Sequence, residues 1–284
     1  MKRENNFEGK RPLLYLIATP IGNRGELSPR ALEIIGEANY IACEDTRNSG
    51  SLFSSLGLKK SLISCHEHNE EEAAEHIIKL LLEGKKVAYV SDAGYPGISD
   101  PGERLVAKAL ANDIKVSVVN GPNAGLCALV ASGLPADHFY FEGFLPAKET
   151  LAKKRLESLQ TLPVTMIFYE APHRIGKTLH LLKETLGGER KACLARELTK
   201  LHEEYIRGTL DELAELDPET LRGEMVIVVE GAAEENKKVG EQEILALLEE
   251  RLKEIRAKEA IAGVSKELGV PKNEVYDLYL KHLK

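Results

Sequence analysis

The sequence predicts an α/β protein with two α/β domains, followed by a small helical hairpin at the C-terminus. Two patterns favour this fold class. Over the first 120 residues, short apolar runs alternate with amphipathic helical patterns, which is typical of a mostly parallel sheet. Between residues 138 and 231, strand patterns follow one another closely enough for antiparallel pairing, so the second sheet is expected to be mixed.

The first domain is expected to contain five strands and four helices. The helix at 28–38 is the clearest of these, because Ser28 is a suitable N-cap and Pro29 suits the first turn. The strands are expected at 13–18, 40–43, 61–64, 85–90 and 114–119. The other helices are expected near 47–56 and at 70–83 and 103–112.

The second domain is expected to begin with a helix at 123–132. Further helices are predicted at 148–160 and 173–186, and strands at 138–142, 164–169, 191–195, 203–208 and 225–231. The sequence thus divides into a disordered lead-in at 1–12, an N-terminal α/β domain at 13–121, a C-terminal α/β domain at 122–232, and a linker with a helix-turn-helix-like hairpin at 233–284.

The C-terminal hairpin is predicted from a helix that stops at Gly269 and a second helix that starts at Pro271. Its lysines favour two interpretations equally, either contact with RNA phosphates or simple exposure to solvent. These lysines are Lys258, Lys266, Lys272 and Lys281.

The composition is that of an ordinary soluble protein, with 43% hydrophobic and 29% charged residues. No apolar run reaches the ~18 residues that a membrane span needs, and no apolar stretch follows the charged N-terminus as in a secretory signal. Four cysteines at wide spacings, without a CxxC pair, fit a reducing cytoplasm. We therefore expect a cytoplasmic protein with no membrane contact.

Neither a metal site nor general nucleic-acid binding is indicated by the composition. Potential metal ligands crowd only in CHEH at 65–68, where a third partner at the usual spacing is missing, so a polar loop is favoured. The net charge of −7 counts against a nucleic-acid binder, so local basic clusters would have to hold RNA.

The segment SDAGYPGISDPG at 91–102 follows a buried strand pattern and is unusually rich in turn residues. In open α/β sheets, ligands bind outside the carboxyl ends of the strands. Its prolines stiffen the loop and its glycines let a ligand approach the backbone, while their spacing differs from GxGxxG. With the carboxylate of Asp92, this loop is predicted to bind a small polar ligand.

The segment IGKT at 175–178 resembles the end of a phosphate-binding P-loop but fails its pattern. The first glycine of GxxxxGK[ST] is replaced by Ala171, and Pro172 and His173 would obstruct an anion cradle. A nucleotide triphosphatase is therefore disfavoured.

Seven segments occur in the order seen in a known enzyme family. They are ATPIGN (18–23), EDTR (44–47), SDAGYPGISDPG (91–102), FEGFLP (141–146), YEAPHR (169–174), ARELTKLHEE (195–204) and GEMVIVVEG (223–231). Together they resemble the small-subunit ribosomal RNA 2′-O-methyltransferases, a branch of the tetrapyrrole (corrin/porphyrin) methylase superfamily. One departure is Asn123, where PGPSA is common in the superfamily, and asparagine can still cap the next helix.

The resemblance implies a tetrapyrrole methylase-like homodimer that binds the methyl donor S-adenosyl-L-methionine in a cleft between its two α/β domains. In that superfamily the donor lies against the loop, turn and strand ends that correspond to Asp92, Ala93, Gly94, Ile98, Asn123, Ala124, Tyr169, Glu170, Glu224 and Met225. The first loop, with Asn23 and Arg24, is expected to face the acceptor.

The implied reaction is in-line attack of a cytidine ribose 2′-hydroxyl on the donor methyl group, in the decoding region of 16S ribosomal RNA. Alignment of the reactants supplies much of the acceleration, and no metal is expected. Carboxylates of these segments are candidate general bases, namely Glu44, Asp45 and Glu197, together with Glu170. For each, an ion pair with a neighbouring arginine (Arg47, Arg174 or Arg196) is an open alternative. Arg47, Arg174, Arg196 and Lys200 are candidate RNA phosphate ligands.

Two other functions stay open at this point. Methylation of a tetrapyrrole or another small molecule is favoured by the acidic charge and the shared scaffold. A non-catalytic RNA-binding or assembly factor would use the C-terminal hairpin, but the intact loop at 91–102 disfavours it. Salt-dependent acceptor binding would separate RNA from a small-molecule acceptor.

Overall fold

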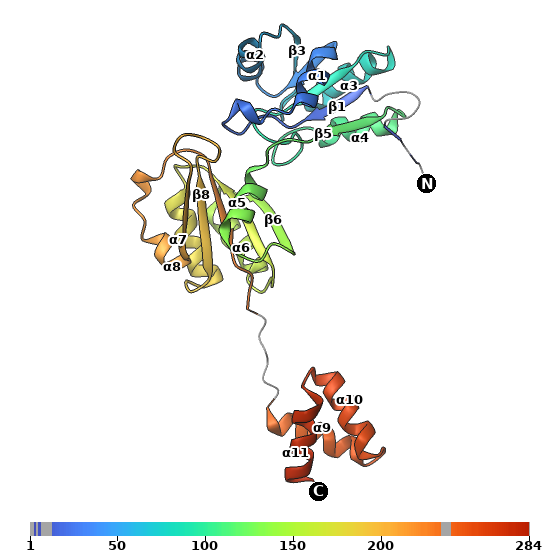
Figure 1. Ribbon diagram of the computed structural model, residues 1–284, viewed down its shortest axis with the longest axis vertical. Coiled ribbons are helices and arrows are strands. Elements are labelled where there is room, and N and C mark those ends of the chain that lie inside the picture. The colour runs from blue at the N-terminus through green and yellow to red at the C-terminus, as the bar shows by residue number, and fades with distance from the viewer. Residues whose placement is uncertain (1–2, 4, 7–12, 234–239, 284) are drawn as a thin grey trace. The chain divides into compact units, whose positions relative to one another are not determined.

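The computed structural model describes residues 3, 5–6, 13–233 and 240–283. The chain forms two compact units, Met1–Ala232 and Ala233–Lys284 (Figure 1). The first unit contains two five-stranded sheets, and the second unit is helical. The α/β fold class predicted from the sequence is confirmed.

The first sheet is entirely parallel, with strand order β3-β2-β4-β1-β5. Its strands are β1 (Leu14–Ile17), β2 (Tyr40–Cys43), β3 (Ser61–Ser64), β4 (Val87–Val90) and β5 (Val116–Val119). Its helices are α1 (Pro29–Glu37), α2 (Thr46–Ser55), α3 (Glu70–Leu82) and α4 (Glu103–Ala111). The five strands and four helices expected in this part of the sequence are all present, in the expected order.

Both faces of this sheet are buried because its side chains alternate between two helical layers. Leu14, Leu16 and Tyr89 pack with residues of α3 and α4, whereas Ile17 and Val90 pack with residues of α1 and α2. The N-cap of α1 is as predicted, since Ser28 Oγ accepts a hydrogen bond from Ala31 N at 3.1 Å. Loops at the carboxyl ends of the central strands are therefore held on a rigid layer.

The second sheet is mixed, with strand order β6-β7-β10-β8-β9, as predicted. Only β6 and β7 pair in parallel, and the other neighbours are antiparallel. Its strands are β6 (Phe139–Phe144), β7 (Thr165–Glu170), β8 (Lys191–Arg196), β9 (Glu204–Thr209) and β10 (Met225–Val229). Its helices are α5 (Ala124–Ser132), α6 (Glu149–Leu159), α7 (Ile175–Leu186) and the short α8 (Leu210–Ala214), which the sequence analysis missed.

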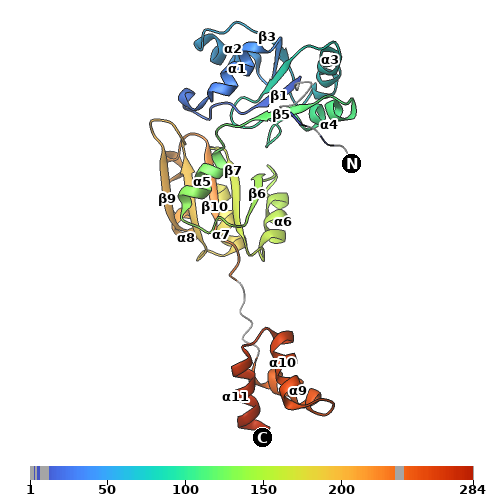
Figure 2. The same cartoon turned by 45° about the vertical axis from the view of Figure 1, so that its right-hand side comes forward.

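Helix α5 covers one face of the second sheet, and α6, α7 and α8 cover the other (Figure 2). Asn123 caps α5 by accepting a hydrogen bond from Leu126 N at 2.8 Å, as expected. Ile21, from the loop after β1, is buried in the same cluster as α5. The loop after β1 thus contacts the layer of the second sheet.

The C-terminal unit contains three helices, α9 (Glu241–Leu252), α10 (Ala257–Leu268) and α11 (Lys272–His282). A two-helix hairpin was expected, but Ile244 and Leu248 of α9 belong to the same core as Ala260, Ile261 and Val264 of α10. The predicted break is confirmed, since Gly269 is left-handed (φ 66°) and Pro271 precedes α11.

Two predicted segments fall largely outside the described residues. The linker prediction covers 234–239, and most of the predicted disordered lead-in lies at 1–2, 4 and 7–12. Of the lead-in, Asn5 O accepts a hydrogen bond from Lys115 Nζ at 2.8 Å, and Asn6 Nδ2 donates one to Val116 O at 3.0 Å. Among the described residues, no helix is long and apolar enough to cross a membrane.

Candidate functional site

The loop at 91–102 leaves the carboxyl end of β4 and is tied to the loop after β1. Because β1 and β4 are neighbours, Thr19 N donates to Gly94 O at 2.9 Å and Gly94 N donates to Thr19 O at 3.0 Å. Ser91 Oγ adds a hydrogen bond to Gly94 O at 3.0 Å. The start of the loop is thereby fixed against the sheet.

The end of the same loop is equally constrained. Gly97 N donates to Pro101 O at 3.1 Å, which closes a tight turn, and Ser99 within it has a left-handed φ of 59°. Gly102 has φ 139° and leaves no room for a β-carbon, which would lie 2.7 Å from Tyr89 Cε1. Non-glycine residues at positive φ cost about 1–3 kcal/mol and cluster at functional sites. The stiffness inferred from the sequence thus has a structural basis.

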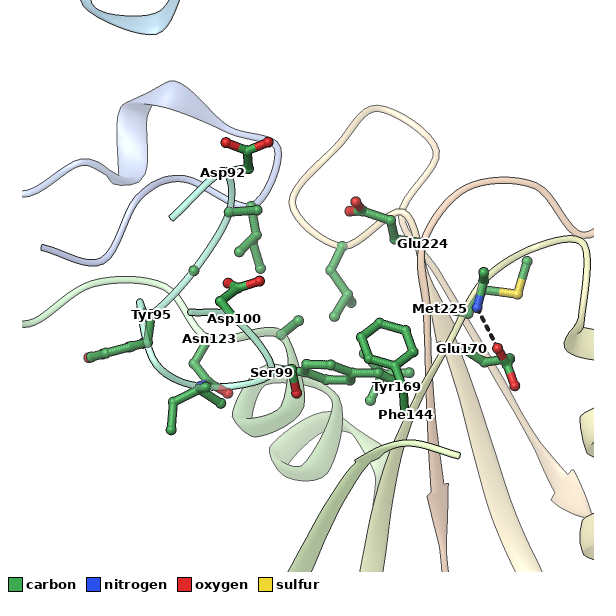
Figure 3. A pocket seen from close by; sticks show the side chains of 18 of the residues that line it. Asp92, Tyr95, Ser99, Asp100, Asn123, Phe144, Tyr169, Glu170, Glu224 and Met225 are labelled. Carbon is green, nitrogen blue, oxygen red and sulfur yellow. Dashed lines mark hydrogen bonds between the residues drawn. The ribbon is translucent and has the colours of Figure 1, made fainter. Parts of the chain in front are cut away.

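A cavity of about 370 Å³ lies beside this loop (Figure 3), within the size range of small-molecule sites. All ten residues expected to hold the methyl donor line it: Asp92, Ala93, Gly94, Ile98, Asn123, Ala124, Tyr169, Glu170, Glu224 and Met225. Residues from four separate segments therefore meet at one cavity.

Nine further lining residues were absent from the predicted set: Ile21, Tyr95, Ser99, Asp100, Phe144, Ala171, Pro172, Leu198 and Val226. Most of them lie within the seven quoted segments. Their positions in those segments were the available signal, but the sequence does not say which residues of a loop face the cavity.

Aromatic residues form one wall of the cavity. Tyr169 packs edge-to-face with Phe144 and Phe141, with ring centroids 5.6 and 5.0 Å apart. Its hydroxyl oxygen accepts a hydrogen bond from Gly125 N at 3.1 Å, which fixes the ring at the start of α5. Burial raises the pKa of Tyr169, so its phenol stays neutral near pH 7.

Glu170 sits at the end of β7, directly opposite Met225 in the antiparallel pair with β10. Its buried carboxylate accepts hydrogen bonds from Ala171 N at 2.8 Å and Thr178 Oγ1 at 2.5 Å. Arg174 Nε lies 3.4 Å from it. A carboxylate therefore fills the turn before IGKT, which is incompatible with an anion cradle and supports the rejection of a P-loop.

The Arg174 side chain is bound to groups within the fold. Besides Glu170, its guanidinium donates to the carbonyl oxygens of Leu145 and Pro146 at 3.1 and 3.2 Å. The ion-pair alternative describes Arg174 better than the predicted contact with RNA phosphate.

The EDTR segment begins α2 and contacts the cavity through Asp92. The Asp92 carboxylate accepts hydrogen bonds from Asn48 Nδ2 at 2.7 Å and from Asp45 N at 3.4 Å. Asp45 in turn caps α2 by accepting from Arg47 N at 2.8 Å, and it pairs with the Arg47 guanidinium at 2.8 Å. The loop at 91–102 and the EDTR segment are thus directly connected.

The two carboxylates of EDTR differ in proton affinity. Hydrogen bonds from Arg47 lower the pKa of Asp45 to about 2, which makes it a poor proton acceptor near pH 7. Burial raises the pKa of Glu44, and repulsion by Asp92 adds to that effect. Neither residue lines the cavity.

The loop between β8 and β9 holds Glu197 and Lys200. Lys200 Nζ donates to Glu197 Oε1 at 2.9 Å, and its side chain covers Gly22, where a β-carbon would lie 2.5 Å from Lys200 Cγ. Glu197 and Thr199 have left-handed φ values of 51° and 67°. This strained loop contributes Leu198 to the cavity wall.

The predicted partner of Glu197 was wrong. Arg196 Nε instead donates to Glu204 on the neighbouring strand β9, and Glu197 pairs with Lys200. Strand β8 ends at Arg196, and Glu197 has a left-handed φ of 51°, so the chain turns between the two residues.

The first loop supplies Asn23 and Arg24. Asn23 accepts a hydrogen bond from Gly25 N at 3.0 Å and caps a short 3₁₀ turn, Arg24–Glu26. Arg24 is exposed, and the Arg47 side chain is 90% exposed. Of the predicted RNA ligands, Arg24 and Arg47 are therefore the most accessible cations.

The cavity is lined by four carboxylates, Asp92, Asp100, Glu170 and Glu224. Burial, together with repulsion from Glu44 and Asp92, raises the pKa of Asp100 to about 6. Such an environment favours a cationic ligand. Within the described residues, no group of three or more histidine, cysteine or acidic side chains could hold a metal ion.

Comparison with known proteins identifies the family. The family model for Tetrapyrrole (Corrin/Porphyrin) Methylases matches residues 13–214, which include both sheets up to α8. The chain belongs to the tetrapyrrole methylase family. A second model, described as the RsmI C-terminal HTH domain, matches residues 238–284.

Curated tetrapyrrole methylases resemble the chain over almost its whole length. The relative from Pseudomonas aeruginosa is 45% identical and is aligned over 94% of this chain and 96% of its own. The relative from Halalkalibacterium halodurans is 40% identical over 98% and 99% of the two chains. Both are named ribosomal RNA small subunit methyltransferase I, which confirms the branch of the family that the seven segments indicated.

Solved tetrapyrrole methylases share the fold at lower identity. The methyltransferase CobJ aligns with a TM-score of 0.59 and 20% identity, covering 78% of this chain and 95% of CobJ. Uroporphyrin-III C-methyltransferase from Thermus thermophilus, complexed with S-adenyl homocysteine, aligns with a TM-score of 0.54 and 19% identity, covering 76% and 96%. These structures confirm the fold.

Proposed function

We propose that this protein transfers the methyl group of S-adenosyl-L-methionine to the 2′-hydroxyl of a cytidine ribose in the ribosomal RNA of the small subunit, in its decoding region. The observation that carries the proposal is that ten donor-binding residues, expected from separate segments, line a single cavity in a chain with ribosomal RNA methyltransferase relatives.

The chemistry of the cavity fits the donor. Its carboxylates suit a sulfonium cation, and the aromatic and aliphatic wall of Tyr169, Phe144 and Ile98 suits an adenine ring. Its volume of about 370 Å³ suits a ligand of this size. Asp92, Ala93 and Gly94 would hold it from the N-terminal side, and Asn123, Tyr169, Glu170 and Met225 from the other.

Each of the two α/β domains would contribute a different part of the active site. Residues 13–121 would supply the acceptor side and the donor-wall loop, and residues 122–232 would complete the donor site. The sheets support this division, since β5 ends at Val119 and α5 begins at Ala124 against the second sheet. A cytoplasmic homodimer is part of the same proposal and rests on the family resemblance.

The acceptor is proposed to be RNA because the relatives at 40–45% identity are named for it. Arg24 and Arg47 are exposed cations near the cavity loops, and a C-terminal HTH domain model matches the helical unit. The net charge of −7 weakens non-specific RNA binding, so we propose an assembled subunit as the target.

The residues of the chain would act mainly by alignment. The donor supplies an activated methyl group on sulfur. The stiff loop at 91–102 and the fixed ring of Tyr169 would hold the cavity in one geometry, so that little ordering is needed when the ribose arrives. The loops after β1 and after β8 are held together by Lys200 over Gly22 and would position the ribose.

The proposal is tested by methyl transfer from labelled S-adenosyl-L-methionine to small ribosomal subunits that lack the modification. Naked ribosomal RNA and a tetrapyrrole precursor serve as parallel acceptors, and nuclease mapping locates the label. We expect label on a cytidine ribose of the assembled subunit. Label on the tetrapyrrole alone would establish the small-molecule alternative, and donor binding without any transfer would leave the substrate assignment wrong.

A further inference from the structure

Two of the four carboxylates that line the cavity are already engaged by neighbouring groups. Asp92 accepts from Asn48 Nδ2 at 2.7 Å and from Asp45 N. Glu170 is held by Ala171 N, Thr178 and Arg174. These bonds occupy carboxylate oxygens that a general base would need to keep open to the substrate.

The remaining acidic residue at the C-terminal side of the cavity is a poor base for a different reason. Glu224 is 77% exposed, and Lys200 Nζ lies 3.7 Å from its carboxylate. Its carboxylate is therefore open to solvent and lies beside a cation, not enclosed in the cavity wall. Asp100 is therefore the cavity carboxylate whose surroundings favour uptake of a proton.

Asp100 lies in the cavity wall near Ser99 and Tyr169 (Figure 3). Its position is set by the tight turn from Gly97 N to Pro101 O and by the left-handed Ser99 that precedes it. The neutral hydroxyl of Ser91 opposes the rise in the pKa of Asp100. Among the described residues, no lysine, arginine or histidine forms an ion pair with Asp100.

We propose that Asp100 is the general base that accepts the proton of the attacking ribose hydroxyl. This role rests on the proposed function. The hydroxyl oxygen forms a bond to the methyl carbon while the methyl–sulfur bond breaks and its electron pair remains on sulfur. The hydroxyl proton passes to an Asp100 carboxylate oxygen and is later released to water. The products are the methyl ether, a neutral thioether and a proton.

The charges that surround Asp100 support this assignment. Glu44 at the end of β2 and Asp92 on the same loop repel its negative form, and Tyr169 of β7 and Ser91 face it as neutral groups. Burial, with the repulsion from Glu44 and Asp92, raises its pKa to about 6, close to the range in which general bases work best. A bound cationic donor would lower this value, so the rate should level off at a lower pH than the free protein titrates.

The decisive variant is Asp100→Asn, which keeps the shape and removes the base. Single-turnover transfer to small subunits is measured at saturating donor from pH 5 to 9, with Glu184→Gln on the exposed face of α7 as the matched control. We expect the wild-type rate to rise with pH and then level off. At saturating donor the transfer rate of the variant should fall roughly 10²–10⁴-fold and lose this rise with pH. Donor binding should weaken only modestly, because one of the four carboxylates that line the cavity loses its charge.

A second measurement follows the same carboxylate without any acceptor. Since burial penalises the charged form, Asp100→Asn should be more stable than wild type at pH 7.5. The difference should shrink as the pH falls below about 6 and vanish by about pH 3, below the unfolded-state pKa, where the wild-type residue is protonated in both states. Urea unfolding of the full chain across this range supplies the comparison. A stability difference that does not change with pH would contradict the environment on which the role depends.

Three outcomes would overturn the role in different ways. Undiminished transfer by Asp100→Asn at saturating donor overturns the base assignment alone. Weaker donor binding with an unchanged transfer rate would make Asp100 a donor ligand instead. A wild-type protein that methylates no RNA overturns the proposed function and this role with it.

Discussion

At the scale of single residues, charged side chains of the site divide into those whose polar atoms are bound within the fold and those that line the cavity without an ion pair among the described residues. Glu170 and Arg174 belong to the first kind, because their polar atoms are bound to the backbone and to Thr178. Asp100 belongs to the second. The distinction decides which substitutions change stability and which change chemistry.

Glu170→Ala should unfold the protein more easily. The residue is 2% exposed, and its removal leaves Thr178, Ala171 N and Arg174 without their shared acceptor. Breaking a buried charged pair costs about 3–5 kcal/mol. Urea denaturation measures the loss, with Glu224→Ala as a control at an exposed position, expected to change stability by less than about 0.5 kcal/mol. Equal stabilities of the two variants would contradict this account.

Arg24→Ala should weaken binding to the small subunit uniformly and reduce its salt dependence. One lost phosphate contact lowers the slope of log affinity against log salt by about 1. Binding measured at several salt concentrations gives the slope, and Lys79→Ala on the exposed side of α3 is the matched control. An unchanged slope for Arg24→Ala would remove this residue from the RNA-binding set.

Residue partners were the least predictable feature of the sequence. The pairing of Glu197 with Lys200 depends on a left-handed backbone at residues 197 and 199, which no propensity signals for glutamate or threonine. Asp100 stood inside a segment that was recognised, but its missing cationic partner is a fact of three-dimensional packing. That the ten expected residues line one cavity was predictable, because the family segments carry most of them.

At the scale of elements, strands and helices followed from periodicity and caps, and the loop at 91–102 followed from its glycines and prolines. Short elements were missed, since α8 has only five residues and its capping box at Thr209 and Glu212 was not noticed. Loop strain could not be foreseen, because it arises from contacts with Tyr89 and Glu70 that are distant in sequence.

Gly102→Ala should disturb the loop and weaken donor binding at least tenfold. The new β-carbon would lie 2.7 Å from Tyr89 Cε1, which is buried and unable to move away. Gly84→Ala is the control, since Gly84 also has positive φ (80°) but nothing within 4 Å. The Gly84→Ala variant should lose about 1 kcal/mol of stability and bind the donor with unchanged affinity. Calorimetric titration with S-adenosyl-L-methionine separates the two.

At the scale of the whole molecule, the chain separates into a unit with both sheets and a three-helix unit. The composition of the linker indicated the division. The sequence did not indicate that α9 packs with the two helices of the hairpin. This packing is visible only in the shared core, which contains Ile244 of α9 and Val264 of α10.

Truncation after Ala232 should leave the donor site intact, since every residue that lines the cavity precedes it. We expect an unchanged donor affinity and a lower affinity for small ribosomal subunits, because phosphate contacts from the helical unit would be lost. Titration with S-adenosyl-L-methionine measures the donor affinity, and binding to small subunits at fixed salt measures the subunit affinity. A large loss of donor affinity would show that the sheets depend on the helical unit.

Asp92 lines the cavity and also accepts hydrogen bonds from Asp45 N and Asn48 at the start of α2, next to exposed Arg47. A ligand that shifts Asp92 must therefore change the free energy of the segment that presents Arg47. Thermodynamic linkage then requires reciprocity. If the bound methyl donor changes the affinity for RNA by some factor through this carboxylate, bound RNA changes the affinity for the donor by the same factor. A reaction product that releases Asp92 would lower the affinities for the donor product and for RNA together, which would couple methyl transfer to dissociation.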